Sequence, residues 1–122
     1  MGALGWIMLV SGVLTCTMVY AAIAPRAALR STFGESLEGP VAEIVVRNWG
    51  ALIALVGGLL IWGAFHPPGR PVALAVAAAS KLIFIILVLA FGRRFLGKAS
   101  VPIAIDAVMV AIFVVALVRS LA

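Results

Sequence analysis

The chain has 122 residues, of which 66% are hydrophobic and 11% are charged, and its formal net charge is +5. A water-soluble domain of this length has a large surface relative to its volume and cannot hide so much apolar side-chain area, so the composition excludes an ordinary soluble fold. No nucleic-acid partner is expected, because no RNA- or DNA-binding motif is present and the basic residues lie beside apolar runs, as they do in membrane proteins. We therefore expect a single integral membrane domain over residues 1–122.

Four apolar runs are each long enough to cross about 30 Å of hydrocarbon, for which about 20 helical residues are needed. They predict an all-α polytopic membrane protein. The second helix is expected to begin at Pro40, because proline is favoured in the first turn of a helix. The first run is expected to be a permanent helix and not a cleaved signal peptide, because no basic residue precedes it. The predicted four-transmembrane-helix bundle has helices over about 4–24, 40–65, 71–91 and 101–121.

The first and second spans are joined by residues 25–39, PRAALRSTFGESLEG. Residues 25–33 predict a short interfacial helix, with Arg26 and Arg30 four positions apart. Phe33 is expected to anchor this helix in the membrane surface, and Gly34 is expected to end it as a C-cap.

Lysine and arginine are distributed unevenly between the two sides of the predicted bundle. Arg70 and Arg119 belong to the side that carries the termini, and six basic residues belong to the other side. Cytoplasmic loops are enriched in Lys and Arg, so we expect both termini outside the cytoplasm of a bacterial inner membrane. The six residues expected on the cytoplasmic side are Arg26, Arg30, Arg47, Arg93, Arg94 and Lys98.

Small residues recur every four positions in three of the spans, a pattern that lets helices approach closely in lipid. In the second span this stripe is expected to be a packing face or an interface between copies of the chain, and Gly57 widens it. In the first and third spans the stripe ends on a polar side chain. The three stripes are Gly12, Cys16 and Tyr20; Gly50, Ala54 and Gly58; and Ala73, Ala77 and Lys81.

Lys81 stands in the middle of the third span, and Asp106 stands inside the fourth. Counted from the predicted cytoplasmic helix ends, they lie about 15 Å and about 8 Å deep, a difference that a lysine side chain about 6 Å long can bridge. Charges inside a membrane are expensive unless they are paired. We predict a Lys81–Asp106 pair, which either acts as the catalytic pair of a functional site or fixes the register of two helices.

Five further side chains are expected near this pair and are candidates for ligand binding. Each has a structural alternative: Glu43 and Arg47 have the spacing of a helical salt bridge, and aromatic residues favour the membrane interface. The polar groups gather in one half of the bundle, which predicts a cavity open to the cytoplasm or the inner leaflet. The five candidates are Tyr20, Glu43, Arg47, Asn48 and Trp49.

Three short motifs, Pro25-Arg26, Phe33-Gly34 and Arg47-Asn48-Trp49-Gly50, carry a resemblance that covers most of the chain. In these motifs the sequence resembles small four-helix bacterial inner-membrane proteins of unknown function. The architecture is also similar to the emopamil-binding-type four-helix membrane domain, whose members hold sterol-like molecules in a pocket with acidic groups. No motif residue of that family is matched here. Small multidrug transporters have the same size, but their acidic residue inside helix one has no counterpart in this chain.

Three functional hypotheses remain open. The first is a pocket that binds a lipophilic small molecule, with or without transforming it by proton transfer as an isomerase or cyclase would. The second is an accessory subunit of a larger membrane complex, and the third is an oligomeric transporter or channel for a small solute. No cofactor or metal is expected, because the sequence has no nucleotide loop, nucleophile motif or metal-ligand spacing. The expected partners are membrane lipid, a lipophilic ligand, and a second copy or another membrane subunit.

Overall fold

The computed structural model describes residues 2–35 and 38–121, so Ser36 and Leu37 of the predicted connection lie outside the described residues. Every secondary-structure element in these two ranges is a helix, which confirms the all-α prediction. In chain order the elements are α1 (Ala3–Cys16), the 3-10 turn η1 (Thr17–Val19), α2 (Tyr20–Ile23), α3 (Pro25–Phe33), α4 (Pro40–Phe65), η2 (Pro67–Gly69), α5 (Arg70–Phe91), η3 (Arg93–Phe95) and α6 (Leu96–Leu121).

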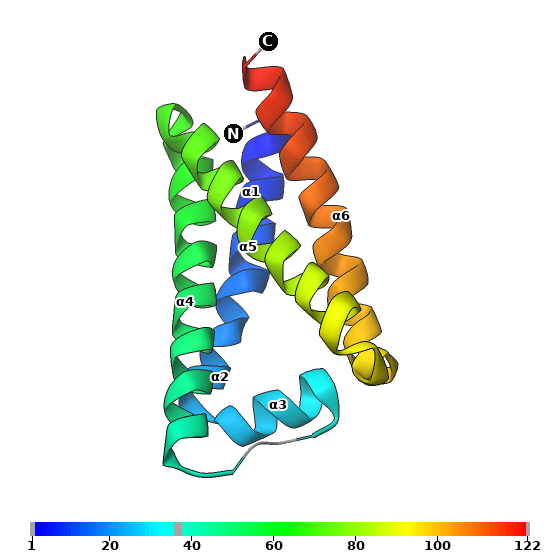
Figure 1. The fold of residues 1–122 in the computed structure, drawn as a ribbon. Coiled ribbons are helices and arrows are strands. Elements are labelled where there is room, and N and C mark those ends of the chain that lie inside the picture. The colour runs from blue at the N-terminus through cyan, green and yellow to red at the C-terminus, as the bar shows by residue number, and fades with distance from the viewer. Residues whose placement is uncertain (1, 36–37, 122) are drawn as a thin grey trace.

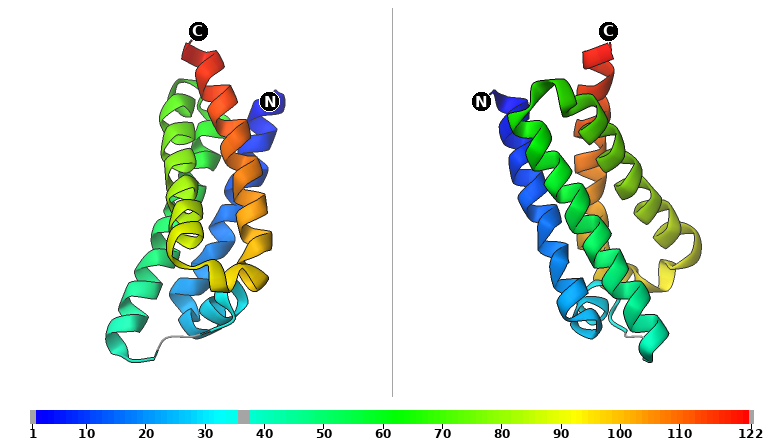
Figure 2. Two further views of the ribbon diagram at one scale, coloured as in Figure 1. Left: turned by 45° about the vertical axis from the view of Figure 1, so that its right-hand side comes forward. Right: turned by 90° about the vertical axis from the view of Figure 1, so that its left-hand side faces the viewer.

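Four helical segments are long and apolar enough to cross a membrane, and they match the four predicted spans. Large apolar side chains, among them Leu55, Ile83 and Val108, are exposed along them, as expected of helices that face lipid. Both termini and η2 lie at one end of the bundle, the termini end, whereas α3 and η3 lie at the other, the α3 end (Figures 1 and 2). The segments are Ala3–Ile23, Pro40–Phe65, Pro67–Phe91 and Arg93–Arg119.

The first span is built from α1, η1 and α2 and is not one uniform α-helix. Thr17 opens the 3-10 turn, and its hydroxyl donates to the carbonyl oxygen of Leu14. Threonine hydroxyls compete for backbone carbonyls in this way and disturb regular helix geometry. The change of helix type was not predicted, because apolar periodicity does not distinguish an α-turn from a 3-10 turn.

The last helix begins earlier than predicted, at Leu96 instead of residue 101. Pro102 therefore lies inside α6, and the added first turns carry Ala99, whose side chain is fully buried. These turns contact α3. The prediction followed the apolar run, but the polar turns before it are helical because they pack against α3.

The short connecting helix has the predicted bounds, Pro25–Phe33, and Gly34 ends it in the left-handed conformation with φ of 79°. The contacts of the Phe33 side chain were not predicted from the sequence. Its ring lies in an aromatic cluster, with centroids 6.4 Å from Trp49, 6.3 Å from Phe84 and 5.5 Å from Phe95. Phe33 therefore packs α3 against α4, α5 and η3, and its role as a membrane-surface anchor stays a prediction.

Helices α1 and α4 approach each other closely through glycine. A Cβ atom added to Gly57 would lie 2.6 Å from the backbone nitrogen of Cys16 and 2.7 Å from the carbonyl oxygen of Gly12. Gly50 packs against α2 in the same way, with Ala21 Cβ 2.6 Å from the added atom. Gly58 was predicted on this face, but it is exposed and nothing lies within 4 Å of its added Cβ. The packing face follows the helical period of Gly50 and Gly57, and it is occupied by the first span, not by a second copy.

Two groups of buried apolar side chains lie along the bundle. At the termini end, Met8, Leu60, Leu74 and Phe113 bring all four long helices together. At the α3 end, the buried group consists of Ala21, Ala28, Leu29 and Val46, from α2, α3 and α4. Neither α5 nor α6 contributes a buried residue to that second group, and Figure 1 shows α5 diverging from α4 toward the α3 end.

Arginine side chains cover the carbonyl groups at three helix ends. Arg70 donates from Nε to the carbonyl oxygen of Gly63 over 3.0 Å and from Nη2 to that of Ala64 over 2.9 Å, in the last turn of α4. Arg47 donates to the carbonyl of Ala22 where α2 ends, and Arg93 donates to that of Leu89. The final carbonyls of a helix have no intrahelical partner, so these contacts supply the missing donors.

We expect Arg70→Met to lower the free energy of unfolding by about 1.5 kcal/mol, because two charge-assisted hydrogen bonds to the α4 carbonyls are lost. The measurement is equilibrium unfolding in mixed detergent micelles. Arg119→Met removes an exposed arginine from the same end of the bundle and should change stability by less than about 0.5 kcal/mol. Equal effects of the two substitutions would show that the carbonyl contacts contribute nothing.

Candidate functional site

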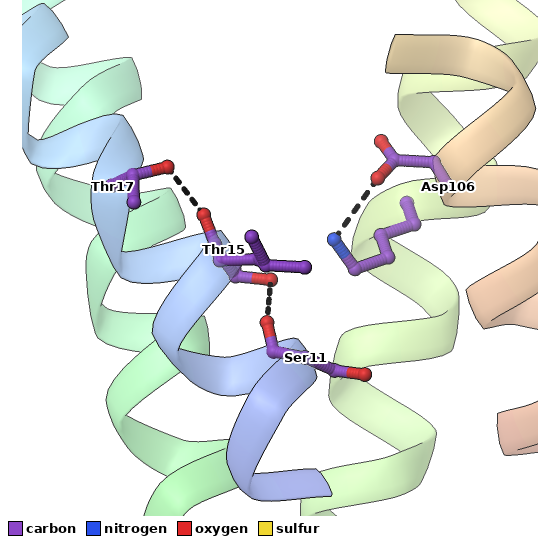
Figure 3. A network of polar contacts seen from close by, with 6 residues as sticks. Ser11, Thr15, Thr17 and Asp106 are labelled. Atoms are coloured by element: carbon purple, nitrogen blue, oxygen red, sulfur yellow. Dashed lines mark hydrogen bonds and ion pairs between the residues drawn. The ribbon is translucent and has the colours of Figure 1, made fainter. Parts of the chain in front are cut away.

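The predicted pairing of Lys81 with Asp106 is confirmed. Nζ of Lys81 donates to Oδ1 of Asp106 over 3.1 Å, and their side chains are 9% and 21% exposed (Figure 3). Lys81 reaches this position from α5, at the end of a stripe whose other members, Ala73 and Ala77, are fully buried. The role of the pair stays a prediction.

The pair does not bridge a difference in depth, as the sequence suggested. Lys81 is ten residues from the end of α5 at Phe91, and Asp106 is ten residues from the start of α6 at Leu96. At 1.5 Å per residue both lie about 15 Å inside their helices. The predicted offset arose because the start of α6 was placed five residues too late. The two charges therefore meet directly and well inside the bundle.

Hydroxyl side chains of the first span lie across from the ion pair. Figure 3 shows Ser11, Thr15 and Thr17 on the helix that faces Asp106. Ser11 and Thr15 are buried, and the Thr15 hydroxyl donates to the carbonyl oxygen of Ser11 over 2.7 Å. The polar groups thus come from opposite walls of the bundle.

A cavity of about 360 Å³ lies between these walls. All four spanning segments and α3 line it, so it occupies the space between the two buried apolar groups. Its lining is mainly apolar and includes Ile53, Val56 and Met109, with the ion pair and several hydroxyls among them. Pockets for small molecules in proteins are typically of this size and combine apolar walls with a few polar groups.

The α3 end of the cavity is lined by side chains of α3 and its aromatic neighbours. Trp49 and Phe84 line the cavity, and both rings lie against Phe33. Tyr20 and Ser31 also line it, and their hydroxyls are hydrogen-bonded to each other. Helix α3 therefore forms a floor beneath the cavity that links the first span to α4 and α5.

The five predicted ligand-binding residues divide between the cavity and the outside. Tyr20 and Trp49 line the cavity. Asn48 is exposed and is not among the lining residues. Glu43 and Arg47 lie instead in an open groove beside α3, together with Arg26.

The predicted Glu43–Arg47 salt bridge is replaced by other contacts. Oε1 of Glu43 accepts from Arg26 over 3.2 Å, and Arg26 also contacts Glu38 over 3.1 Å. Arg47 turns toward the end of α2, where the carbonyl groups of Ala22 and Ile23 accept its hydrogen bonds. The helix is interrupted at Ala24, between α2 and α3, and this interruption leaves these carbonyls without helical partners. The spacing of Glu43 and Arg47 along α4 cannot predict such a contact with another segment.

Several cavity residues were not assigned to the site from the sequence, namely Thr17, Ser31, Thr32 and Ser80. For Thr32, the sequence contained a pattern that could have predicted its burial. The buried residues of α3 are Pro25, Ala28, Leu29 and Thr32, which is the period of a helix with one covered face. The side chain of a polar residue that completes such a face is expected to point toward the protein interior and not toward water.

Neither a scan against protein-family models nor searches of curated proteins and solved structures find a protein that matches this chain. The arguments about function therefore depend on the geometry of the site. Within residues 2–35 and 38–121, no three His, Cys, Asp or Glu side chains gather in a way that could hold a metal ion.

Proposed function

We propose that this protein is an integral membrane protein that binds a lipophilic small molecule in the cavity between its helices. The observation that carries the proposal is the cavity itself, about 360 Å³ of space with apolar walls and a buried Lys81–Asp106 pair. A cavity that was only a packing defect would need no charged pair in its wall. Ionisable groups are rare inside membrane helices and are usually functional.

The lining supports a lipophilic ligand with one polar group. Ile53, Val56 and Met109 offer apolar contact, and the ion pair with the hydroxyls of Thr15 and Tyr20 can orient a polar group. The exposed apolar surface of the spanning segments supports insertion in a membrane, from which such a ligand would be taken up.

The distribution of basic residues supports the orientation that we propose in a bacterial inner membrane. The α3 end carries Arg26, Arg30, Arg93 and Arg94 on its short elements, whereas Arg70 and Arg119 lie toward the termini. By the positive-inside rule the α3 end faces the cytoplasm and both termini lie outside. The cavity would then open to the inner half of the bilayer.

Proton transfer is the reaction that this site would support. An ammonium and a carboxylate held 3.1 Å apart can give a proton to a ligand and take one from it, as general acid and general base. Isomerisation or cyclisation of the bound molecule belongs to this class. Lys81 and Asp106 are the proposed catalytic residues.

Filling the cavity tests the proposal. Val56 lines the cavity, and its neighbour Leu55 points outward with 69% exposure. We expect Val56→Phe to reduce retention of a lipophilic ligand by about tenfold, because the added ring occupies the ligand's space, and Leu55→Phe to leave retention unchanged. The measurement is native mass spectrometry of each purified protein, which shows bound small molecules by their mass.

Both variants add the same side chain to α4, so they share any general effect of phenylalanine on expression or insertion. Equal retention of small molecules by the two variants, or no bound small molecule in any of the proteins, would contradict a ligand-binding cavity.

A further inference from the structure

The cavity carries no net charge. Among the described residues that line it, Lys81 and Asp106 are the two with charged side chains, and they neutralise each other across 3.1 Å. A ligand with a net charge would therefore bring an unbalanced charge into a mainly apolar space, which is strongly unfavourable. This balance favours an uncharged ligand.

Four of the hydroxyls around the cavity have already donated their protons. Thr15 donates to the carbonyl of Ser11, Thr17 to that of Leu14 and Ser31 to that of Ala28. Since Ser31 uses its proton there, the proton between Tyr20 and Ser31 comes from Tyr20. Each of these oxygens can offer a ligand only lone pairs, so each can only accept a hydrogen bond.

The ammonium of Lys81 is the complementary group. It has three N–H donors, of which the contact with Asp106 uses one. The site therefore combines acceptors on the side of the first span with a donor on the side of α5. An ether or ester oxygen could satisfy only the donor, whereas a hydroxyl group can donate to one side and accept from the other.

We infer that the cavity binds an uncharged lipophilic alcohol, with its hydroxyl group between the Lys81–Asp106 pair and the hydroxyls of the first span. This inference rests on the proposed function and adds the chemical class of the ligand. An apolar molecule without a polar group would make no hydrogen bond with the remaining donors of Lys81 or with the free lone pairs of the hydroxyls. The apolar walls hold the hydrocarbon part of the ligand.

The test uses the fluorescence of Trp49, which lines the cavity. Trp6 and Trp62 are replaced by phenylalanine, which leaves Trp49 as the single tryptophan of the three in the chain. The probes are four molecules with the same brominated saturated chain, ending in an alcohol, a methyl ether, a carboxylate or an amine. Bromine quenches a nearby tryptophan, so saturable quenching in detergent micelles reports binding. At about pH 8 the carboxylate and the amine are both charged.

We expect the alcohol to bind at least about tenfold more tightly than the other three probes, because it alone is uncharged and both donates and accepts. Val56→Phe in the same background should abolish the saturable part, and Leu55→Phe should not. A control protein in which Trp62, near the termini end, is the single tryptophan measures the quenching caused by probe dissolved in the micelle.

Equal binding of the ether and the alcohol, or tighter binding of either charged probe, would overturn the inference while leaving a ligand cavity in place. No saturable quenching by any probe would contradict the proposed function itself.

Changing the charge of the pair gives a second readout. Asp106→Asn leaves the cavity with a net positive charge, and Lys81→Met leaves it with a net negative charge. Where these variants fold, the first should shift preference toward the carboxylate probe and the second toward the amine, each by about tenfold or more relative to the alcohol. An unchanged order of affinities in both folded variants would show that the pair does not face the polar group of the ligand.

Discussion

Replacing Asp106 by asparagine is expected to lower the free energy of unfolding by about 3 kcal/mol, because it leaves the Lys81 ammonium without its counter-charge inside the bundle. The lysine side chain is 9% exposed, so water compensates for only part of the lost contact with the carboxylate. The converse substitution, Lys81→Met, strands a carboxylate that is 21% exposed and closer to solvent, and we expect a smaller loss. Equilibrium unfolding in mixed detergent micelles measures both.

The double variant separates a structural pair from a functional one. Replacing both charges at once removes the unpaired group, so we expect Lys81→Met with Asp106→Asn to recover to within about 1 kcal/mol of the original stability. The recovered protein should nevertheless lose saturable binding of the alcohol probe. Lys98→Met is the matched control, since Lys98 is exposed near the start of α6.

Two results would contradict these expectations in different ways. If the single variants are as stable as the original protein, the pair makes no stabilising contact and the bundle tolerates either charge alone. If the double variant is stable and still binds the probe with unchanged affinity, the pair fixes the register of α5 and α6 and has no part in binding.

The sequence predicted the elements whose signals are local. Pro40 begins α4 and Gly34 ends α3 because each suits one backbone conformation, and both effects act within a single turn. The Lys81–Asp106 pair was predictable for a different reason: two opposite charges deep in adjacent apolar helices have few other partners. The first two predictions required only the residue and its neighbours in the chain, and the third required only that the two charged helices be adjacent.

Several features that the sequence did not predict share one cause, which is α3. Its position beneath the bundle gives Phe33 an aromatic surrounding, draws Ser31 and Thr32 to the cavity and extends α6 to Leu96. The sequence indicated an interfacial helix with correct bounds but did not indicate what covers it. Contacts between segments far apart in the chain decide that, and helical periodicity within one segment does not contain this information.

The second large effect is expected at Gly57, where alanine should lower the free energy of unfolding by about 2 kcal/mol. The added Cβ would lie 2.6 Å and 2.7 Å from backbone atoms of Cys16 and Gly12, so no rotation of a side chain can relieve the contact and α1 must move away. The loss is the net of this overpacking and a gain of up to about 1 kcal/mol from the higher helix propensity of alanine. Gly58→Ala is the control on the same helix, because nothing lies within 4 Å of its added Cβ.

Cys16 provides a direct readout of the displacement of α1, because it is the single cysteine of the chain and lies at the contact with Gly57. In the original protein its Sγ is 3.5 Å from the carbonyl oxygen of Ala54. Moving α1 away from α4 should make Cys16 react several-fold faster with a maleimide in Gly57→Ala but not in Gly58→Ala. Thr15, the neighbour of Cys16, lines the cavity, so the same displacement should weaken binding of the alcohol probe. Unchanged cysteine reactivity together with unchanged binding in Gly57→Ala would show that the glycine contact does not position this wall of the cavity.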